Sequence, residues 1–219
     1  PEITLFAQES GESVYLMMMA IPPKNDVFKI SDRPRELIFI IDSSGSMSGG
    51  SMVQAKESLY EALERLKPTD RFNIIDFDSG FKPLYESAML ASETHIREAR
   101  GFIRKIDADG GTEMYKPIDF ALNSRDSESE NYLRQIVFIT DGQAGNERAI
   151  FSTVESDIDN DRFFTIGIGS APNSYLLTKL ADFGRGAYTY IGSQNEVSQK
   201  MNRLFEKLES PALTDIQVH

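Results

Sequence analysis

The 219-residue sequence contains no cysteine, no tryptophan and only two histidines. Without thiolates the chain can form neither a disulfide nor a cysteine–zinc site, and it has no cysteine nucleophile. A serine hydrolase needs a positioned base, and the only histidines are His95, inside a predicted helix, and His219, the last residue. We therefore expect neither thiol chemistry nor histidine-dependent hydrolysis.

Basic residues are also in deficit, because 23 Lys and Arg stand against 34 Asp and Glu, for a formal net charge of -11. Non-specific nucleic-acid binding and binding to anionic membranes both need a basic surface, so the composition argues against both. No stretch of the sequence approaches the roughly 20 apolar residues of a membrane-spanning helix. We expect no nucleic-acid partner and no direct membrane insertion of this segment, and we interpret the acidity mainly as a source of solubility.

The length suits one α/β domain with a small appendage, and the 40% hydrophobic fraction is enough for a full core. β-rich runs at 3–8 and 14–21 are separated by polar residues and a glycine, which predicts a hairpin. We expect residues 1–34 to form this hairpin and a linker, 35–209 to form the main domain, and 210–219 to begin a following segment.

From residue 35 onward, apolar strands alternate with amphipathic helices. Such alternation indicates a mostly parallel sheet with helices on both faces. We therefore expect an α/β, doubly wound, mostly parallel six-stranded sheet flanked by helices, with a short N-terminal β-hairpin extension. The predicted strands are 37–41, 72–77, 82–85, 135–140, 162–168 and 187–191, the predicted helices are 52–66, 93–106, 115–123, 147–157, 174–183 and 196–208, and 125–131 is predicted to be a charged surface loop.

Three segments far apart in the sequence carry oxygen ligands where an open α/β sheet binds its ligands. One follows the strand at 37–41, one follows the strand at 135–140, and the third is a Gly-rich loop at 110–112. The carboxyl ends of parallel strands share one edge, and ligands bind there at the point where strand order reverses. If the segments converge, they bring together two carboxylates and three hydroxyls, from Asp42, Ser44, Ser46, Thr112 and Asp141.

Oxygen-only ligands select hard cations, and Mg²⁺ or Mn²⁺ prefers about six ligands in near-octahedral geometry. Two aspartates offset the charge of a divalent ion, so a carboxylate from a partner can complete the shell. Ca²⁺ fits less well, because hydroxyls are poor ligands for it and bidentate acids are scarce here. The set therefore predicts a Mg²⁺ or Mn²⁺ site that recruits a ligand from outside.

Each segment alone has a simpler interpretation. A Ser/Gly-rich loop after a strand is often only a helix entry, with Ser51 as its cap, and Asp-Gly is common turn chemistry. Glu113 beside the Thr112 position is expected to point outward or to support the site. The Gly-Ile-Gly at 167–169 lacks the third glycine of a dinucleotide motif and predicts a tight turn. The order and context of the three segments together favour the metal site.

The segment Ile-Ile-Asp-Ser-Ser-Gly-Ser-Met at 40–47 resembles the Asp-x-Ser-x-Ser signature of the von Willebrand factor A domain. Gly-Gly-Thr at 110–112 and Ile-Thr-Asp-Gly at 139–142 are similar to its second and third metal-site segments. The resemblance runs from about residue 36 to residue 208. It implies a Rossmann-like fold with a metal-ion-dependent adhesion site (MIDAS). It also implies that Ser44, Ser46 and Thr112 contact the metal by hydroxyl, and Asp42 and Asp141 directly or through water.

A closer resemblance is to the inter-alpha-trypsin inhibitor heavy chains and their bacterial relatives. It is carried by Phe-Asn-Ile-Ile at 72–75, Gly-Ile-Gly at 167–169 and Ser-Pro-Ala-Leu-Thr-Asp at 210–215. In those proteins a β-rich vault-type domain precedes this one, so residues 1–34 would be strands and linker from such a domain. The resemblance implies a role in cell adhesion and a secreted, cell-surface or periplasmic location.

These observations lead to one hypothesis and two alternatives. The hypothesis is a non-enzymatic, divalent-cation-dependent protein-binding domain that coordinates an Asp or Glu side chain of a partner. A haloacid-dehalogenase-like phosphotransferase also places an Asp after an apolar strand, but it needs a general acid two residues on, where this chain has Ser44. The other alternative is a structural scaffold module with a vestigial metal site.

Overall fold

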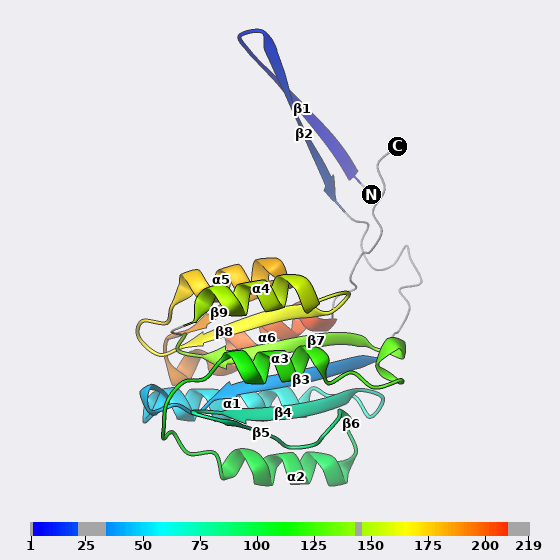
Figure 1. Ribbon diagram of the computed structural model, residues 1–219. Coiled ribbons are helices and arrows are strands. Elements are labelled where there is room, and N and C mark those ends of the chain that lie inside the picture. Colours follow the sequence, from blue (N-terminus) through cyan, green and yellow to red (C-terminus); the bar gives the residue numbers. More distant parts are fainter. Residues whose placement is uncertain (1, 22–33, 143–145, 210–219) are drawn as a thin grey trace. The chain divides into compact units, whose positions relative to one another are not determined.

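The computed structural model describes residues 2–21, 34–142 and 146–209. The chain divides into two compact units, Pro1–Asp32 and Arg33–His219. The first unit carries a two-stranded hairpin, and the second carries the main sheet and all of the described helices (Figure 1). Most of the predicted linker and the whole of the predicted following segment lie outside the described residues.

The predicted hairpin is confirmed as an antiparallel pair of strands, β1 (Glu2–Ser10) and β2 (Ser13–Ile21). Directly paired residues share a face of the hairpin. The pairs Leu5–Met18 and Ala7–Leu16 therefore form one largely apolar face. An isolated two-stranded hairpin is marginally stable in water, so this ribbon is suited to contact with further β-structure. Its large hydrophobic side chains are 43% to 68% exposed, and they are Ile3, Leu5, Phe6, Val14, Tyr15, Leu16, Met17, Met18 and Met19.

The second unit is built on a sheet in the order β5-β4-β3-β7-β8-β9, with the short strand β6 also paired to β4. β3, β4, β7, β8 and β9 are parallel, and the short strands β5 and β6 run antiparallel to β4. The mostly parallel sheet is therefore confirmed, with β6 as one strand beyond the expected set. The strands are β3 (Arg35–Asp42), β4 (Arg71–Phe77), β5 (Phe81–Pro83), β6 (Met89–Leu90), β7 (Leu133–Thr140), β8 (Arg162–Ile168) and β9 (Arg185–Ile191).

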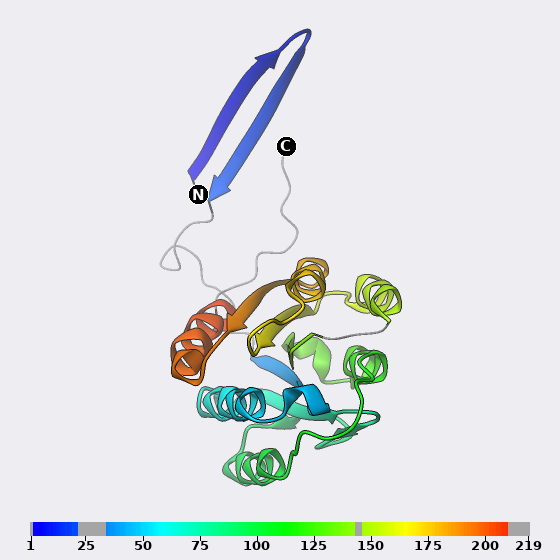
Figure 2. The ribbon, with the colours of Figure 1, turned by 90° about the vertical axis from the view of Figure 1, so that its left-hand side faces the viewer.

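Helices cover both faces of the sheet, as a view turned by 90° shows (Figure 2). The central strand β3 is buried throughout, and its side chains alternate between two cores. Leu37, Phe39 and Ile41 pack on the side of α1, α2 and α6, whereas Ile38 and Ile40 pack on the side of α3, α4 and α5. The helices are α1 (Gly50–Glu64), α2 (Glu93–Arg104), α3 (Tyr115–Asn123), α4 (Glu147–Asp157), α5 (Ser174–Phe183) and α6 (Val197–Glu209), with 3₁₀ turns η1 (Gly45–Met47), η2 (Ser129–Asn131) and η3 (Gln194–Glu196).

Buried charges gather at the edge where the parallel strands begin, which we call the amino edge. Glu36 is fully buried, accepts a hydrogen bond from Arg134 Nε at 2.7 Å, and pairs with Arg71 Nη1 at 3.3 Å. Arg71 also pairs with Asp126, and this hydrogen-bonded contact holds the pKa of Asp126 well below its usual range. The predicted charged surface loop at 125–131 is confirmed, since most of its residues are exposed, and Asp126 and the buried Ser129 also contact the ion pairs at this edge.

The entry to α1 also differs from the prediction. The helix begins at Gly50, and its N-cap residue is Gly49, with φ of +74° and no side-chain cap hydrogen bond. Ser51 therefore lies inside the first turn and does not cap the helix. A glycine takes this left-handed turn without the strain that a side chain would add.

Candidate metal site

The three predicted oxygen segments meet at the carboxyl edge, the edge formed by the C-terminal ends of the parallel strands. β3 lies between β4 and β7, and the chain passes from β3 through α1 to β4 before it returns on the other side at β7. The crevice between β3 and β7 is therefore the point where strand order reverses, which is the usual ligand site of such sheets. Asp42 ends β3, and Asp141 directly follows β7.

Asp42 is fully buried and its carboxylate is held from two sides. Its Oδ1 accepts the backbone N–H of Ser44 at 2.8 Å, and its Oδ2 accepts the hydroxyl of Thr140 at 2.5 Å. Thr140 Oγ1 in turn accepts the backbone N–H of Gly142 at 2.8 Å, so one hydroxyl ties the β7 turn to the β3 carboxylate. Both oxygens of Asp42 are thus oriented before any ligand arrives.

Burial raises the pKa of Asp42 above its usual value, while hydrogen bonds from Ser44 and Thr140 oppose that shift. The charge of Asp141 raises the pKa further, which places the second carboxylate within electrostatic reach of the first. A cation between two such carboxylates would relieve both their repulsion and the cost of burying Asp42. The arrangement of the two acids is therefore suited to a positive ligand.

The first two predicted hydroxyls lie together in the loop after β3. Ser44 Oγ and Ser46 Oγ are 3.1 Å apart, and Ser44 is buried whereas Ser46 is exposed. The short turn η1 that follows Ser44 is fixed by the fully buried side chain of Met47. The loop therefore places one buried and one exposed hydroxyl side by side at the rim of the crevice.

The Gly-rich loop packs directly against this turn. The N–H of Gly45 donates to the carbonyl of Gly110 at 3.1 Å, and the N–H of Asp109 donates to the carbonyl of Ser43 at 2.9 Å. A Cβ on Gly110, whose φ is +88°, would lie 3.0 Å from Asp78 Oδ2, so this position favours glycine. Thr112 follows two residues later and is half-buried. The loop carrying Thr112 therefore borders the loop carrying Ser44 and Ser46.

Asp141 sits at the start of the turn after β7. Its carbonyl accepts the backbone N–H of Asn173 at 3.1 Å, which joins this turn to the entry of α5. Gly142 has φ of +80°, and a Cβ there would lie 2.9 Å from the Asn173 backbone nitrogen. The close approach of the two backbones therefore fixes a glycine directly beside the second carboxylate.

The donor set fits a hard divalent cation and few other groups. Across the described parts of the chain, no three His, Cys, Asp or Glu side chains gather as a metal cluster. An ion at the carboxyl edge would therefore take its protein ligands from two carboxylates and neighbouring hydroxyls, with the remaining positions open. The role of Thr140 in orienting Asp42 was not predicted from the sequence. The only indication there is a hydroxyl residue at the end of a buried strand, directly before an Asp.

The residues behind the alternative readings have structural roles. His95 lies on α2 and its Nδ1 contacts the carbonyl of Leu90 at 2.7 Å, beside the amino edge. Glu113 Oε1 accepts the N–H of Tyr115 at 3.2 Å at the entry of α3. Gly169 has φ of +90° directly after β8, where it makes the turn that its sequence indicated.

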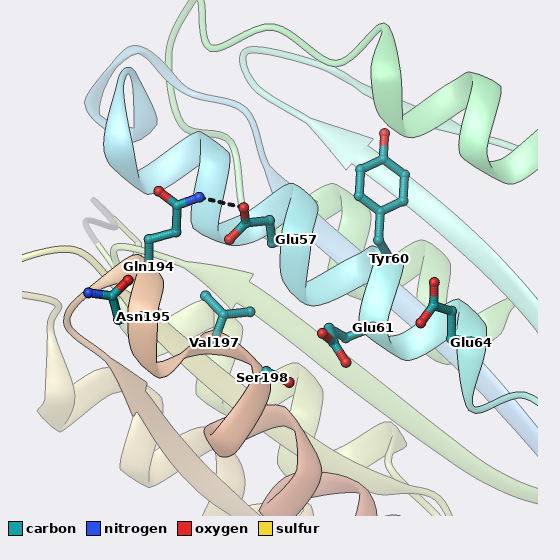
Figure 3. Close-up of a pocket in the computed structure, with 8 residues that line it drawn as sticks. All are labelled: Glu57, Tyr60, Glu61, Glu64, Gln194, Asn195, Val197 and Ser198. Atoms are coloured by element: carbon teal, nitrogen blue, oxygen red, sulfur yellow. Dashed lines mark hydrogen bonds between the residues drawn. The ribbon is translucent and has the colours of Figure 1, made fainter.

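A polar hollow of about 320 Å³ lies between α1 and the η3–α6 segment (Figure 3). None of its lining residues is a predicted metal ligand. Glu57 accepts a hydrogen bond from Gln194 Nε2 at 2.5 Å across the hollow, and Glu64 pairs with Arg100 at 3.0 Å. These contacts join α1 to the η3 turn and to α2, so we assign the residues that line the hollow a structural role.

Comparison with known proteins agrees with this geometry. A profile of the von Willebrand factor type A domain matches residues 35–190. A von Willebrand factor A domain-containing protein of Dictyostelium discoideum is 34% identical over 84% of this chain and 20% of its own length. Inter-alpha-trypsin inhibitor heavy chain H2 of Sus scrofa is 25% identical over 84% of this chain and 21% of its own length. The chain spans about a fifth of the length of the first curated relatives it matches.

Two solved structures share the fold. The von Willebrand factor type A protein from Catenulispora acidiphila has a TM-score of 0.70, with 21% identity over 87% of this chain and 43% of that one. The manganese-loaded TRAP protein of Plasmodium vivax has a TM-score of 0.61, with 18% identity over 78% of this chain and 73% of that one.

Proposed function

Because this chain belongs to the von Willebrand factor type A domain family, we propose that it is a divalent-cation-dependent protein-binding domain of the adhesion type. The observation that supports this most strongly is the buried Asp42 carboxylate at the strand-order reversal. It lies within electrostatic reach of Asp141 and beside the Ser44–Ser46 hydroxyl pair, of which Ser46 is exposed. Such a site can hold a cation and still leave a face of that cation open.

In this proposal the hydroxyls of Ser44, Ser46 and Thr112 and the carboxylates of Asp42 and Asp141 hold Mg²⁺ or Mn²⁺. When bound, the ion supplies a coordination position for an oxygen ligand from outside the chain. Thr140 and the Ser44 backbone N–H keep the Asp42 carboxylate oriented, and their hydrogen bonds oppose the rise in its pKa that burial causes. Two protein carboxylates leave little excess negative charge, so the proposed partner donates an Asp or Glu side chain.

We propose a binding role and not a catalytic one on the basis of the side chains beside Asp42. Phosphoryl transfer from a nucleophilic Asp requires a general acid, and the residue two positions on is Ser44, whose hydroxyl contacts Ser46. His95 contacts the Leu90 carbonyl near the amino edge of the sheet, whereas Asp42 lies at the carboxyl edge. The arrangement therefore orients an acceptor for a ligand, and the position two residues after Asp42 offers no carboxyl group as a general acid.

We further propose that residues 1–34 belong to a β-rich domain that precedes residues 35–209, and that 210–219 begin the next segment. The exposed apolar side chains of the hairpin support this, because a large apolar surface is usually covered. A location at the cell surface or in the periplasm follows from the family resemblance. Among the described helices, none is both long and apolar enough to cross a membrane.

A selection from random displayed peptides tests the proposal without a known partner. Peptides are bound to the immobilised chain in Mg²⁺ and eluted with EDTA, in parallel with an Asp42→Asn chain. We expect the eluted peptides to share an Asp or Glu that is required for binding, and to be absent from the Asp42→Asn surface. Equal EDTA-released pools from both surfaces, or peptides indifferent to loss of their carboxylate, would contradict the function.

A further inference from the structure

We propose that the metal-bearing edge selects partners whose coordinating carboxylate is surrounded by Lys and Arg, with Asp78, Asp109 and Glu113 as specificity-determining residues. The inference rests on the proposed function and adds the chemistry of the partner's neighbouring residues. It follows from the acidic residues in the loops around the candidate site.

The loops at the carboxyl edge carry acidic residues and no basic ones. They contain six Asp and Glu and no Lys, Arg or His. An acidic surface concentrates cationic groups and repels anionic ones, so a carboxylate can approach it most easily when it is carried by a basic segment. We define these edge loops as the described residues 42–49, 78–80, 107–114, 141–142 and 169–173.

A divalent ion would offset the charges of Asp42 and Asp141, but the other acids would remain. Asp78, Asp109 and Glu113 are connected to the ligand loops by backbone hydrogen bonds. The N–H of Asp109 donates to the Ser43 carbonyl at 2.9 Å, and the N–H of Glu113 donates to the Asp78 carbonyl at 2.7 Å. These three acids therefore form one patch on the β4 side of the site, which we call the acidic patch.

Within the described residues, the acids of the acidic patch form no ion pair, and their carboxylates accept hydrogen bonds from backbone N–H groups. Asp78 accepts the N–H of Gly80 at 2.9 Å, Asp109 accepts that of Gly110 at 2.8 Å, and Glu113 accepts that of Tyr115 at 3.2 Å. Elsewhere in the described chain, ion pairs use other acids, namely Glu36, Glu64, Asp70, Asp126, Asp161 and Glu209. The patch is thus fixed in position and carries negative charge toward a partner.

The opposite side of the site also carries a carboxylate. The edge loop at 169–173, which follows β8, contains no Asp, Glu, Lys, Arg or His, but its Asn173 Nδ2 donates to Glu147 Oε1 at 2.8 Å. Among the described residues, acids therefore lie on both sides of the metal position, and most of them lie toward β4. A partner whose basic residues flank the carboxylate on that side gains attraction, whereas an acidic peptide is repelled.

The peptides released by EDTA in the selection above test this inference separately from the function. We expect Lys and Arg to be enriched within a few positions of the required Asp or Glu. A variant with Asp109→Asn and Glu113→Gln keeps the oxygen acceptors of its loop and should lose that enrichment. The matched control is Glu155→Gln with Asp182→Asn, which removes two exposed charges near the far ends of α4 and α5.

The rate of association gives a second readout with one selected basic peptide. For the Asp109→Asn and Glu113→Gln variant we expect the association rate to fall about three- to tenfold at low salt. The difference should shrink at high salt, because screening shortens the reach of surface charges to a few ångströms. The control variant should associate at the wild-type rate.

Three outcomes would overturn the inference. EDTA-released peptides that share an Asp or Glu but show no basic enrichment would reject it and leave the proposed function standing. A Mg²⁺ affinity that falls as much as the peptide affinity would show that the acidic patch serves the cation and not the partner. An equal loss of peptide association in the control variant would mean that net charge alone acts.

Discussion

Replacing Thr140 by Val removes one hydroxyl from the candidate site at almost constant shape. The hydroxyl donates to Asp42 Oδ2 at 2.5 Å and accepts from the Gly142 N–H at 2.8 Å, in a fully buried position. A hydrogen bond to a charged group contributes about 1.5–3 kcal/mol. Its loss removes this stabilisation of the ionised form and therefore raises the pKa of Asp42.

The direction of the pH effect follows from the sign of this shift. Burial already raises the pKa of Asp42, and the Thr140 hydroxyl opposes that rise, so the variant raises it further. A metal needs the ionised carboxylate, and a proton therefore competes with it from a higher pH in the variant. We expect Mg²⁺ affinity close to wild type at pH 7.5 and a deficit that grows as the pH falls. At pH 5 the affinity should be lower by about tenfold, which corresponds to about 1.5 kcal/mol, the lower end of the hydrogen-bond range.

Calorimetric Mg²⁺ titrations from pH 5 to pH 8 measure this change, and urea unfolding of the same samples measures stability. Thr165→Val is a matched control, because Thr165 is equally buried but donates to the neutral Leu177 carbonyl at 2.9 Å. It should lose stability without altering the pH profile of Mg²⁺ binding. Identical profiles for wild type and Thr140→Val would refute the assigned role of this hydroxyl.

Three further changes test the buried ion pairs of the sheet and the glycine turn beside Asp141. Glu36→Gln breaks fully buried ion pairs and should reduce the free energy of unfolding by about 3–5 kcal/mol in urea titrations; a loss below about 1 kcal/mol would contradict this. Gly142→Ala should lower both stability and Mg²⁺ affinity, because φ is +80° and Cβ meets a backbone atom. As the control for that change, Gly101→Ala in α2 has open space around the new Cβ and should be neutral or stabilising. Asp126→Asn should lower the free energy of unfolding at pH 7. Because the pKa of Asp126 is lowered in the folded state, this difference from wild type should disappear as the pH falls through the acidic range. A difference that does not change with pH would argue against the Arg71 contact.

Regular elements were predictable because their hydrophobic period is local. The strand at 162–168 and the helices at 115–123, 147–157 and 174–183 match the structure residue for residue. Each combines an apolar pattern with polar or glycine residues at its ends, and such signals need no knowledge of distant contacts. The pairing of β3 with β7 could also be anticipated, since parallel strands align their carboxyl ends.

Features that depend on long-range contacts could not be predicted. Glu36 reads as a polar residue at a strand start, and only the partners Arg71 and Arg134, far away in sequence, explain its burial. Thr140 reads as an ordinary strand residue until β3 brings Asp42 beside it. The predicted cap of α1 was wrong. Ser51 is a common cap residue type, but the backbone turn at Gly49 determines where the helix begins. Chemistry at the site was therefore visible in the sequence, but the groups that orient it were not.

Calorimetric titration of Mg²⁺ into the wild-type chain and into Asp42→Asn tests directly whether the buried Asp42 carboxylate belongs to a divalent-cation site. Asn keeps the size of the buried side chain and removes its charge, and circular dichroism can verify that the fold is retained. We expect one Mg²⁺ site in the wild-type chain and an affinity lower by at least about tenfold in the folded variant, because a direct or water-bridged carboxylate ligand is lost. Equal Mg²⁺ binding by the two chains, or no binding by the wild type, would contradict this expectation.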